Sequence, residues 1–160
     1  MGDVFDDMTI RYLHGGCSLL VGSVSPDGRP HAGRAWGLTV VDNEHAEVRL
    51  LLNVNDTTTV ANLQPGAAVA ICTADVETLR SLQVKGRVLA VEQADEADIA
   101  RQQRYTAEFT GDVHRTDGEP MEKLLRWADC SVIACVIALD EAFDQTPGPS
   151  AGARVQAATS

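Results

Sequence analysis

Basic side chains are scarce in this chain. Of its 160 residues, 13 are Lys or Arg and 23 are Asp or Glu, which gives a formal net charge of −10 at pH 7. Nucleic acids and anionic membrane surfaces are bound through clusters of basic side chains. The charge therefore argues against general binding to either, and we expect no nucleic acid and no membrane among the partners.

Long hydrophobic runs are also missing. No apolar stretch approaches the roughly 20 residues of a membrane-spanning helix. Residues 1–12 carry acids where a secretory signal peptide would carry a basic start. We therefore expect a cytoplasmic protein. The hydrophobic fraction of 44% is ordinary for a globular domain, and the length is sufficient for one domain with its own core.

Metal-ligand and phosphate-binding motifs are absent. The cysteines lie in or beside apolar stretches, without a Cys-x-x-Cys pair: Cys17, Cys72, Cys130 and Cys135. The histidines are scattered: His14, His31, His45 and His114. We expect no metal site, and we interpret the cysteines as reduced core thiols. No G-x-G-x-x-G or P-loop sequence is present, so nucleotide binding of those kinds is not indicated.

The most informative stretch runs from Cys17 to Val54. It alternates β-rich runs with turn residues, and the expected strands are Ser18–Ser25, about Pro30–Val41 and Ala46–Val54. The intervening turns are Pro26-Asp27-Gly28-Arg29 and Asp42-Asn43-Glu44. Pro fixes φ, and Gly supplies the positive φ of a tight reversal. The pattern predicts an antiparallel meander.

The second of these strands has one face of small residues. Successive side chains of a strand point to opposite faces. One face carries His31, Gly33, Ala35, Gly37 and Thr39, and the other carries Arg34, Trp36, Leu38 and Val40. A planar ligand on the bare face would explain the pattern, because glycine in a strand often marks close approach by a ligand. Tight packing inside a barrel would explain it equally well.

The rest of the chain adds helices and further strands. Helices are expected within residues 1–16 and 55–63, from the N-cap Asp95 toward Phe109 with Gly111 just past the end, and within residues 116–127. Strands are expected over residues 67–73, 78–92 and 131–139. This predicts one mainly β domain, residues 1–143, built as a six-stranded antiparallel barrel with inserted helices. The Pro/Gly/Ala-rich tail, residues 144–160, is predicted to be an arm or a disordered end.

A local reversal of charge is the strongest chemical signal. Gln83, Lys85 and Arg87 share one face of the expected strand over residues 78–92. Such a face suits an anionic ligand such as a phosphate, although a solvated outer face is the alternative. Arg34, with Trp36 on the same face, is a second candidate. The strand register decides whether Arg34 and Lys85 converge.

Three segments together resemble the pyridoxamine 5′-phosphate oxidase-like superfamily, the FMN-binding split barrels. They are GCSLLVGSVSPDGRPHAGRAWGLTV, LLNVNDTTTVANLQPGAAVAI and LQVKGRVLAVE, and the likeness covers about residues 8–140. The resemblance implies a six-stranded split barrel and a homodimer with FMN in clefts at the subunit interface. Hydrophobic surface beyond what one small barrel should expose also favours a dimer.

The resemblance also implies which residues bind the cofactor. Trp127 and the Pro/Gly-rich tail are the candidates for reaching across the dimer interface, and Trp127 is added to the cofactor residues. The complete set is Arg34, Ala35, Trp36, Gly37, Asn53, Thr57, Thr58, Thr59, Gln83, Lys85 and Trp127. We expect the cofactor phosphate to meet Lys85, assisted by Arg34 and the hydroxyls of Thr57–Thr59. No catalytic side chain is identified, because a flavin would carry the chemistry itself.

The chain departs from the family in two places. Thr57-Thr58-Thr59 stands where members that hold FMN well carry a basic pattern. Exchanging charge-assisted bonds for neutral ones should cost about 1–3 kcal/mol of binding. Arg154-Val155-Gln156 replaces the terminal Arg-x-His of the true oxidases, so pyridoxamine phosphate is not the expected substrate.

Three functional hypotheses remain. The first is an FMN-dependent oxidoreductase acting on an unidentified small-molecule substrate. The second is a reductase that uses a deazaflavin as a diffusible cosubstrate on the same fold. The third is a non-enzymatic module that binds flavin or haem.

Overall fold

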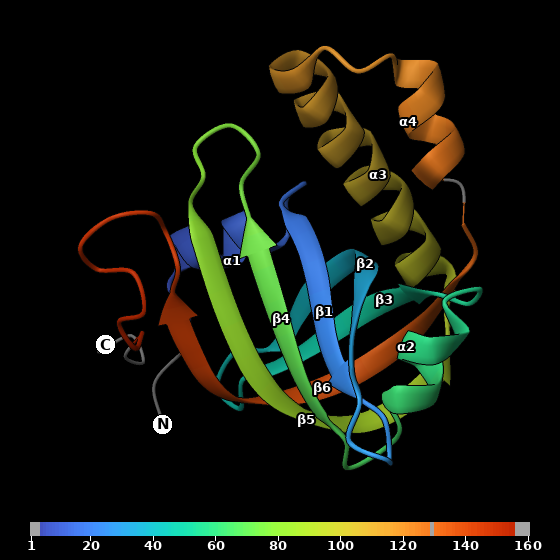
Figure 1. Ribbon diagram of the computed structural model, residues 1–160, viewed down its shortest axis with the longest axis vertical. Helices are drawn as coiled ribbons and strands as arrows, with labels where there is room; N and C mark the ends of the chain where they lie inside the picture. Colours follow the sequence, from blue (N-terminus) through green and yellow to red (C-terminus); the bar gives the residue numbers. More distant parts are fainter. Residues whose placement is uncertain (1–3, 129, 156–160) are drawn as a thin grey trace.

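The computed structural model describes residues 4–128 and 130–155, which form six strands and four helices (Figure 1). The strands are β1 (Ser18–Val24), β2 (Pro30–Asp42), β3 (Glu47–Asn53), β4 (Ala68–Ala74), β5 (Ser81–Gln93) and β6 (Val132–Asp144). The helices are α1 (Asp7–Leu13), α2 (Thr57–Asn62), α3 (Glu96–Asp117) and α4 (Met121–Ala128).

The strands close into one antiparallel barrel. Their order around the barrel is β1-β2-β3-β6-β5-β4, and every neighbouring pair is antiparallel. The predicted six-stranded antiparallel barrel with inserted helices is therefore confirmed. The expected meander is present as β1, β2 and β3.

Alternation along the strands builds the core. In β1, Leu19 and Val21 are fully buried, whereas Leu20 between them is 49% exposed. Ile71 of β4 and Val84 of β5 point inward in the same way. Burying such a side chain stabilises the fold by about 1.5–3 kcal/mol, so the inward rows hold the barrel closed.

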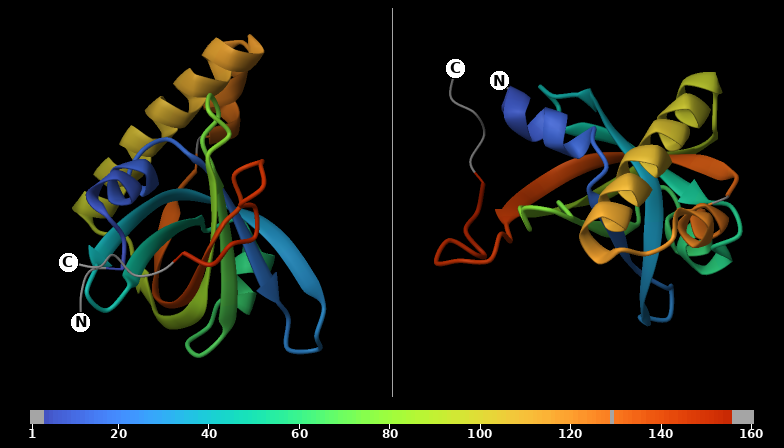
Figure 2. Two further views of the ribbon diagram at one scale, coloured as in Figure 1. Left: turned by 90° about the vertical axis from the view of Figure 1, so that its left-hand side faces the viewer. Right: turned by 90° about the horizontal axis from the view of Figure 1, so that it is seen from above.

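The long helix α3 lies across β2, and α4 packs beside α3 (Figures 1 and 2). A capping box starts α3: the Asp95 side chain accepts from the backbone of Asp98, and the Asp98 side chain accepts from the backbone of Asp95. Arg101 of α3 is buried and donates to the carbonyls of Leu38 and Gly15, which fixes the helix to β2 and to the segment after α1.

The predicted end of α3 near Phe109 is wrong. The helix continues through Gly111 and ends at Gly118, whose φ of 72° is the left-handed conformation of a glycine C-cap. The helix tolerates Gly111 because packing of its buried face outweighs the roughly 1 kcal/mol that glycine costs relative to alanine.

Of the segment predicted to be an arm or a disordered end, residues 145–155 follow β6 as a loop, and residues 156–160 lie outside the described part. Asp144 accepts hydrogen bonds from Thr146, Ser150 and the backbone N–H of Gly152. The Ser81 backbone N–H donates to the Thr146 hydroxyl, and Val155 donates to the Ala142 carbonyl. The segment is therefore an ordered loop folded back on β5 and β6.

Candidate functional site

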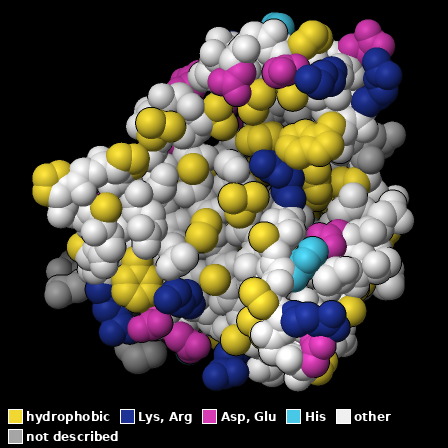
Figure 3. Space-filling view, in the orientation of Figure 1, with side chains coloured by type: hydrophobic (Ala, Val, Ile, Leu, Met, Phe, Trp, Pro, Cys, Tyr) yellow, Lys and Arg dark blue, Asp and Glu magenta, His cyan; other side chains and the backbone are white. Residues whose placement is uncertain are grey.

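The outward side chains of β2, β1, β4 and β5 form a continuous surface, which we call the four-strand face (Figure 3). The register places two rows of residues across it. The first row is Arg34, Leu20, Cys72 and Gln83, and the second is Ala32, Gly22, Ala70 and Lys85. Small and apolar residues thus fill most of the face; its polar and basic members are Arg34 at the β2 edge and Gln83 and Lys85 at the β5 edge.

The four-strand face exposes more apolar surface than an isolated barrel should. Leu20 is 49% exposed and Val24 is 51% exposed, and Cys72 beside Leu20 is also exposed. In Figure 3, hydrophobic side chains are spread over a hollowed surface below the helices. Contiguous exposed apolar surface of this kind marks a ligand or protein interaction site.

At the β2 edge, aromatic rings enclose Arg34. Its guanidinium lies 4.8 Å from the centroid of the Phe109 ring and 4.6 Å from that of Trp127. Trp36 packs edge-on against Tyr105 and Trp127, with centroid distances of 6.4 and 5.2 Å. We call Arg34, Trp36, Tyr105, Phe109 and Trp127 the Arg34 cage. Cation–π contacts stabilise the guanidinium and fix its position, but they supply no hydrogen-bond acceptor.

The Arg34 cage contains two buried polar atoms without partners. Neither Nη1 of Arg34 nor the phenol oxygen of Tyr105 has a hydrogen-bond partner within the described residues. Burial raises the pKa of the Tyr105 phenol, and the positive charge of Arg34 opposes that shift. An unsatisfied buried polar group costs about 1–3 kcal/mol. A ligand that brings an acceptor to the half-buried Arg34 guanidinium would offset part of this cost.

At the β5 edge, Lys85 and Arg87 border a cavity of about 430 Å³ that His31 also lines. The predicted sharing of a face by Gln83, Lys85 and Arg87 agrees with the register against β4. The Lys85 ammonium lies 5.0 Å from the centroid of the Phe143 ring. Lys85 is also the register partner of Glu141 on β6. The positive charge is therefore partly offset on this edge.

Arg34 and Lys85 share the four-strand face but do not converge. Strands β1 and β4 lie between them, and with strands about 4.8 Å apart the two Cα atoms are separated by about 15 Å. Their charged groups are also held at opposite edges, one by the rings of α3 and α4 and the other by Phe143 of β6. Within one chain, a single phosphate cannot bind both.

The start of α2 does not suit a phosphate. Asp56 caps the helix: its carboxylate accepts from the backbone N–H of Thr59 at 3.1 Å and from the Thr59 hydroxyl at 2.6 Å. His31 lies 3.6 Å from the same carboxylate. Thr59 is fully buried. A phosphate bound by the Thr57–Thr59 hydroxyls, as the sequence led us to expect, would therefore lie beside the Asp56 carboxylate, which would repel it.

The small face of β2 is explained by packing. A Cβ on Gly33 would lie 2.1 Å from the Thr59 hydroxyl oxygen, so α2 fills the space in front of Gly33. Gly37 has a φ of 151° beside a β-bulge, and its Cβ would lie 3.0 Å from Leu51. The interpretation that these glycines make room for a planar ligand is therefore wrong at both positions.

The other predicted cofactor residues are divided between the core and the surface. Ala35 is buried in the barrel, while Thr57 and Thr58 are exposed. The Asn53 side chain accepts from the backbone N–H of Asn55, shaping the turn before α2. Trp127 contacts rings of its own chain and leaves 51% of its surface exposed.

Sequence reasoning missed the contribution of α3 to the Arg34 cage. Tyr105 and Phe109 stand four residues apart and stack with their ring centroids 5.7 Å apart. Such spacing places two side chains on one helix face, and it was the available signal. Which strand residue they would meet depends on tertiary packing.

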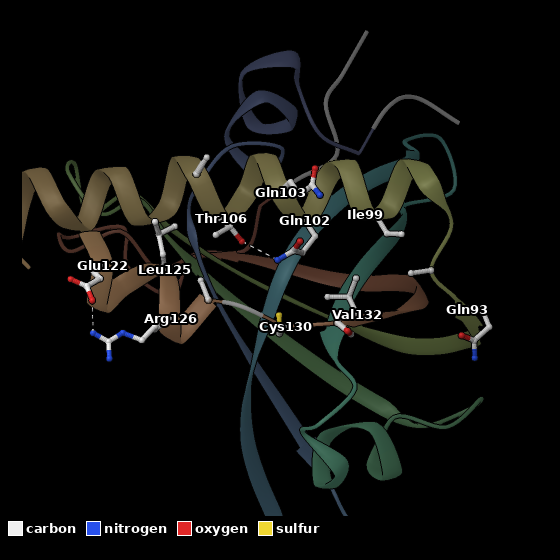
Figure 4. A pocket seen from close by; sticks show the side chains of 14 residues that line it. Gln93, Ile99, Gln102, Gln103, Thr106, Glu122, Leu125, Arg126, Cys130 and Val132 are labelled. Carbon is white, nitrogen blue, oxygen red and sulfur yellow. Dashed lines mark hydrogen bonds and ion pairs between the residues drawn. The ribbon is translucent and has the colours of Figure 1, made fainter. Parts of the chain in front are cut away.

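A second concavity, of about 870 Å³, lies between α3 and α4 and was also missed (Figure 4). Within residues 4–128 and 130–155, no three side chains of His, Cys, Asp and Glu come close enough together to hold a metal ion. In the same part of the chain, no helix is both long and apolar enough to cross a membrane.

No protein-family model matches the chain, and no curated protein matches its sequence. Solved structures do share its fold. HupZ from Group A Streptococcus is 15% identical with a TM-score of 0.56, over 92% of this chain and 100% of that one. An F420 reductase is 19% identical with a TM-score of 0.53, over 82% and 93%.

A third solved structure is a putative pyridoxamine 5′-phosphate oxidase from Lactobacillus delbrueckii. It is 16% identical with a TM-score of 0.52, over 89% of this chain and 99% of that one. At these identities the likeness establishes the fold alone. The chain has the pyridoxamine 5′-phosphate oxidase-like split-barrel fold, as the sequence segments predicted.

Proposed function

We propose that this protein binds a flavin, FMN, on the four-strand face and acts as a flavin-dependent oxidoreductase on a small molecule. The observation that carries the proposal is Arg34: a half-buried cation fixed between two rings, with its buried Nη1 lacking a partner, at the edge of an exposed apolar surface. Solved structures with this fold include an F420 reductase and a putative pyridoxamine 5′-phosphate oxidase, which supports redox chemistry on it.

The four-strand face offers what a flat aromatic cofactor needs. Its middle is lined by Ala32, Gly22 and Ala70, whose small side chains leave room for a ring to approach the sheet. Gln83 and Lys85 supply an amide and a cation at one edge. The chain's own part is to position the cofactor and exclude water, while a bound flavin supplies the hydride chemistry.

A second copy of the chain would cover the cofactor. Leu20 and Val24 are each about half exposed, and burying such side chains favours association. We therefore propose a homodimer in which two four-strand faces approach one another. The half-exposed Trp127 lies above the Arg34 guanidinium and would cover the edge of the site.

Arg34 is the proposed partner of the cofactor phosphate, in place of the combination of Lys85, Arg34 and the α2 threonines. Its guanidinium offers unused donors, whereas the α2 start carries the Asp56 carboxylate. Charge-assisted hydrogen bonds to phosphate are stronger than neutral ones, and arginine binds phosphate through two parallel donors.

Titration with FMN and with riboflavin, which lacks the phosphate, tests this assignment. Losing one charged partner should cost about 1.5–3 kcal/mol, so Arg34→Gln should weaken FMN at least about tenfold and leave riboflavin nearly unchanged. Arg29→Gln is the control, because Arg29 is an exposed turn residue paired with Asp27.

The variant Lys85→Ala shows which of the two cations, Arg34 or Lys85, binds the phosphate. If the phosphate lies at the β5 edge instead, Lys85→Ala should weaken binding of FMN but not of riboflavin, and Arg34→Gln should change neither affinity. That result would reassign the phosphate to Lys85 and leave the flavin proposal standing. A folded protein that binds neither FMN nor riboflavin would overturn the flavin proposal. The absorption spectrum of the purified protein adds a direct check, because flavin and haem have distinct visible bands.

A deazaflavin cosubstrate is the second candidate, and Asp56 is the observation that favours it. A carboxylate at the α2 start disfavours a doubly charged phosphate monoester more than a singly charged diester such as that of a deazaflavin. Binding of a reduced deazaflavin with at least about tenfold higher affinity than FMN would favour this candidate.

A further inference from the structure

A groove separate from the four-strand face lies between α3 and α4. Its volume is about 870 Å³, within the roughly 300–1,000 Å³ of small-molecule sites. Figure 4 shows α3 along one wall, α4 at one end, and Cys130 and Val132 below. The α3 side chains that line it, such as Ile99 and Thr106, occupy a different face of the helix from Tyr105 and Phe109 of the Arg34 cage.

The described residues that line the groove carry no net charge. Its charged members are Glu122 and Arg126, which pair with each other across one turn of α4 at 2.9 Å. This pair lies at one end of the groove in Figure 4. In a chain with a net charge of −10, a concavity of this size whose described lining is neutral stands out. Among the described lining residues, a charged ligand would find no opposite charge that is not already paired.

The groove combines an apolar body with hydrogen-bonding groups. Ile99 of α3 and Leu125 of α4 are each 48% exposed there. The Gln102 amide nitrogen donates to the Thr106 hydroxyl at 3.1 Å, which leaves the amide oxygen and the hydroxyl hydrogen for a ligand. Gln93 and Ser131 add further donors and acceptors.

We propose that this groove is a second binding site, for a small neutral molecule with an apolar ring or chain and an amide, carbonyl or hydroxyl edge. The apolar side chains bury its body, and the amide and hydroxyl groups orient its polar edge. We expect the site to be independent of flavin binding, since its described lining lies outside the Arg34 cage and shares with the strands of the four-strand face only Gln93, the last residue of β5.

Two matched dyes test the chemical class. Phenylnaphthylamine is neutral, and anilinonaphthalene sulfonate has the same aromatic skeleton with one negative charge. We expect saturable enhancement of phenylnaphthylamine fluorescence, with one dye per chain, and at least about tenfold weaker binding of the sulfonate. Both titrations use the full chain with and without FMN, and the dye affinity should not change.

Two alanines of α3 give a matched pair of variants. Ala107 lines the groove, whereas Ala97 is exposed in the first turn of the same helix and does not. Ala107→Phe should fill the groove and weaken phenylnaphthylamine at least about tenfold, while Ala97→Phe should leave it unchanged. If Ala107→Phe lowers the midpoint of thermal unfolding, Leu125→Asp tests the same point, because it places a charge in the exposed apolar wall of the groove.

The outcomes separate cleanly. Equal dye affinity in the parent, Ala107→Phe and Leu125→Asp would overturn the site. Tighter binding of the sulfonate than of the neutral dye would overturn the proposed class of ligand. Displacement of the dye by FMN would show that the groove belongs to the flavin site and would overturn its independence.

Discussion

The Thr59 hydroxyl occupies the space that a side chain on Gly33 would need. An ideal Cβ on Gly33 would lie 2.1 Å from Thr59 Oγ1 and 2.5 Å from a carboxylate oxygen of Asp56. Thr59 is held in place by its hydrogen bond to Asp56. One glycine of β2 thus decides how closely α2 packs on the barrel.

Gly33→Ala should therefore destabilise the fold. Overpacking of a filled site costs about 1–3 kcal/mol, because Thr59 and its hydrogen bond to Asp56 must move. Gly22→Ala is the control on the neighbouring strand, since its Cβ would meet Ala70 at an ordinary 3.7 Å. Chemical denaturation of both variants gives the comparison. Equal stability of the two would contradict the packing explanation.

The barrel was predictable because its strands alternate. In β5, Leu82 and Val84 alternate with the polar Gln83 and Lys85 and are buried, and polar turns separate the strands. The ends of α3 and of the ordered C-terminal segment were not predictable, because both depend on contacts between segments that are far apart in the sequence. Gly111 resembles a helix stop until its surroundings are known, and Asp144 organises a loop through partners up to Gly152.

Single residues of the candidate site were predictable from the sequence, but their arrangement relative to one another was not. Arg34 and Trp36 were correctly placed on one face, since both contact Trp127. Their separation from Lys85 depends on the strand order, in which β1 and β4 intervene. That order joins segments far apart in the sequence, and neither alternation nor charge pattern specifies it.

Arg49 links β3 to the start of α3 through two acids of unequal burial. It donates to both carboxylate oxygens of Asp98, at 2.8 and 2.7 Å, and to Glu92 at 2.5 Å. Asp98 has an 8% exposed side chain and Glu92 a 51% exposed one. Asp98→Asn should cost about 2–3 kcal/mol of unfolding free energy, and Glu92→Gln about 0–1 kcal/mol.

The same pair predicts a pH dependence. The Arg49 guanidinium lowers the pKa of the Asp98 carboxyl in the folded state. Its contribution is therefore present above the ordinary value of 3.8 and is lost as the pH falls through the folded pKa. Unfolding free energies of the parent and Asp98→Asn should converge with falling pH in this range. A constant difference would contradict the charge-based explanation.

His14 predicts a second pH effect, closer to neutrality. Its Nε2 accepts from the backbone N–H of Val40 at 2.8 Å, which requires the neutral ring. Burial, followed by the charges of Arg101 and Arg104, lowers the pKa of His14 from its usual 6.5. The unfolded chain then binds the proton more readily, so stability falls as the pH drops below about 6.5.

His14→Gln should remove this component, because an amide oxygen can accept from Val40 but does not titrate in this range. The midpoint of thermal unfolding should depend less on pH between about pH 7 and about pH 5 than in the parent. His45→Gln is the contrasting variant, because the Asp42 carboxylate raises the pKa of the exposed His45 ring, and its loss should steepen the pH dependence instead of flattening it. An unchanged pH slope in His14→Gln would show that His14 does not contribute.

The four-strand face predicts that assembly and flavin binding fail together. Leu20 lies in its middle, between Arg34 and Cys72, and is 49% exposed. Leu20→Arg would place a charge at the centre of the proposed dimer interface, where desolvation of an unpaired ion is costly. Val41→Arg is the matched control, because Val41 is 50% exposed at the far end of β2.

Sedimentation equilibrium should show a dimer for the parent and Val41→Arg, and a monomer for Leu20→Arg. FMN affinity should fall at least about tenfold in Leu20→Arg alone, because the cofactor would lose the cover of the second copy. A Leu20→Arg dimer with parental FMN affinity would place both the interface and the cofactor elsewhere on the barrel. A monomer that still binds FMN as tightly as the parent would separate the two, leaving a flavin site complete within one chain.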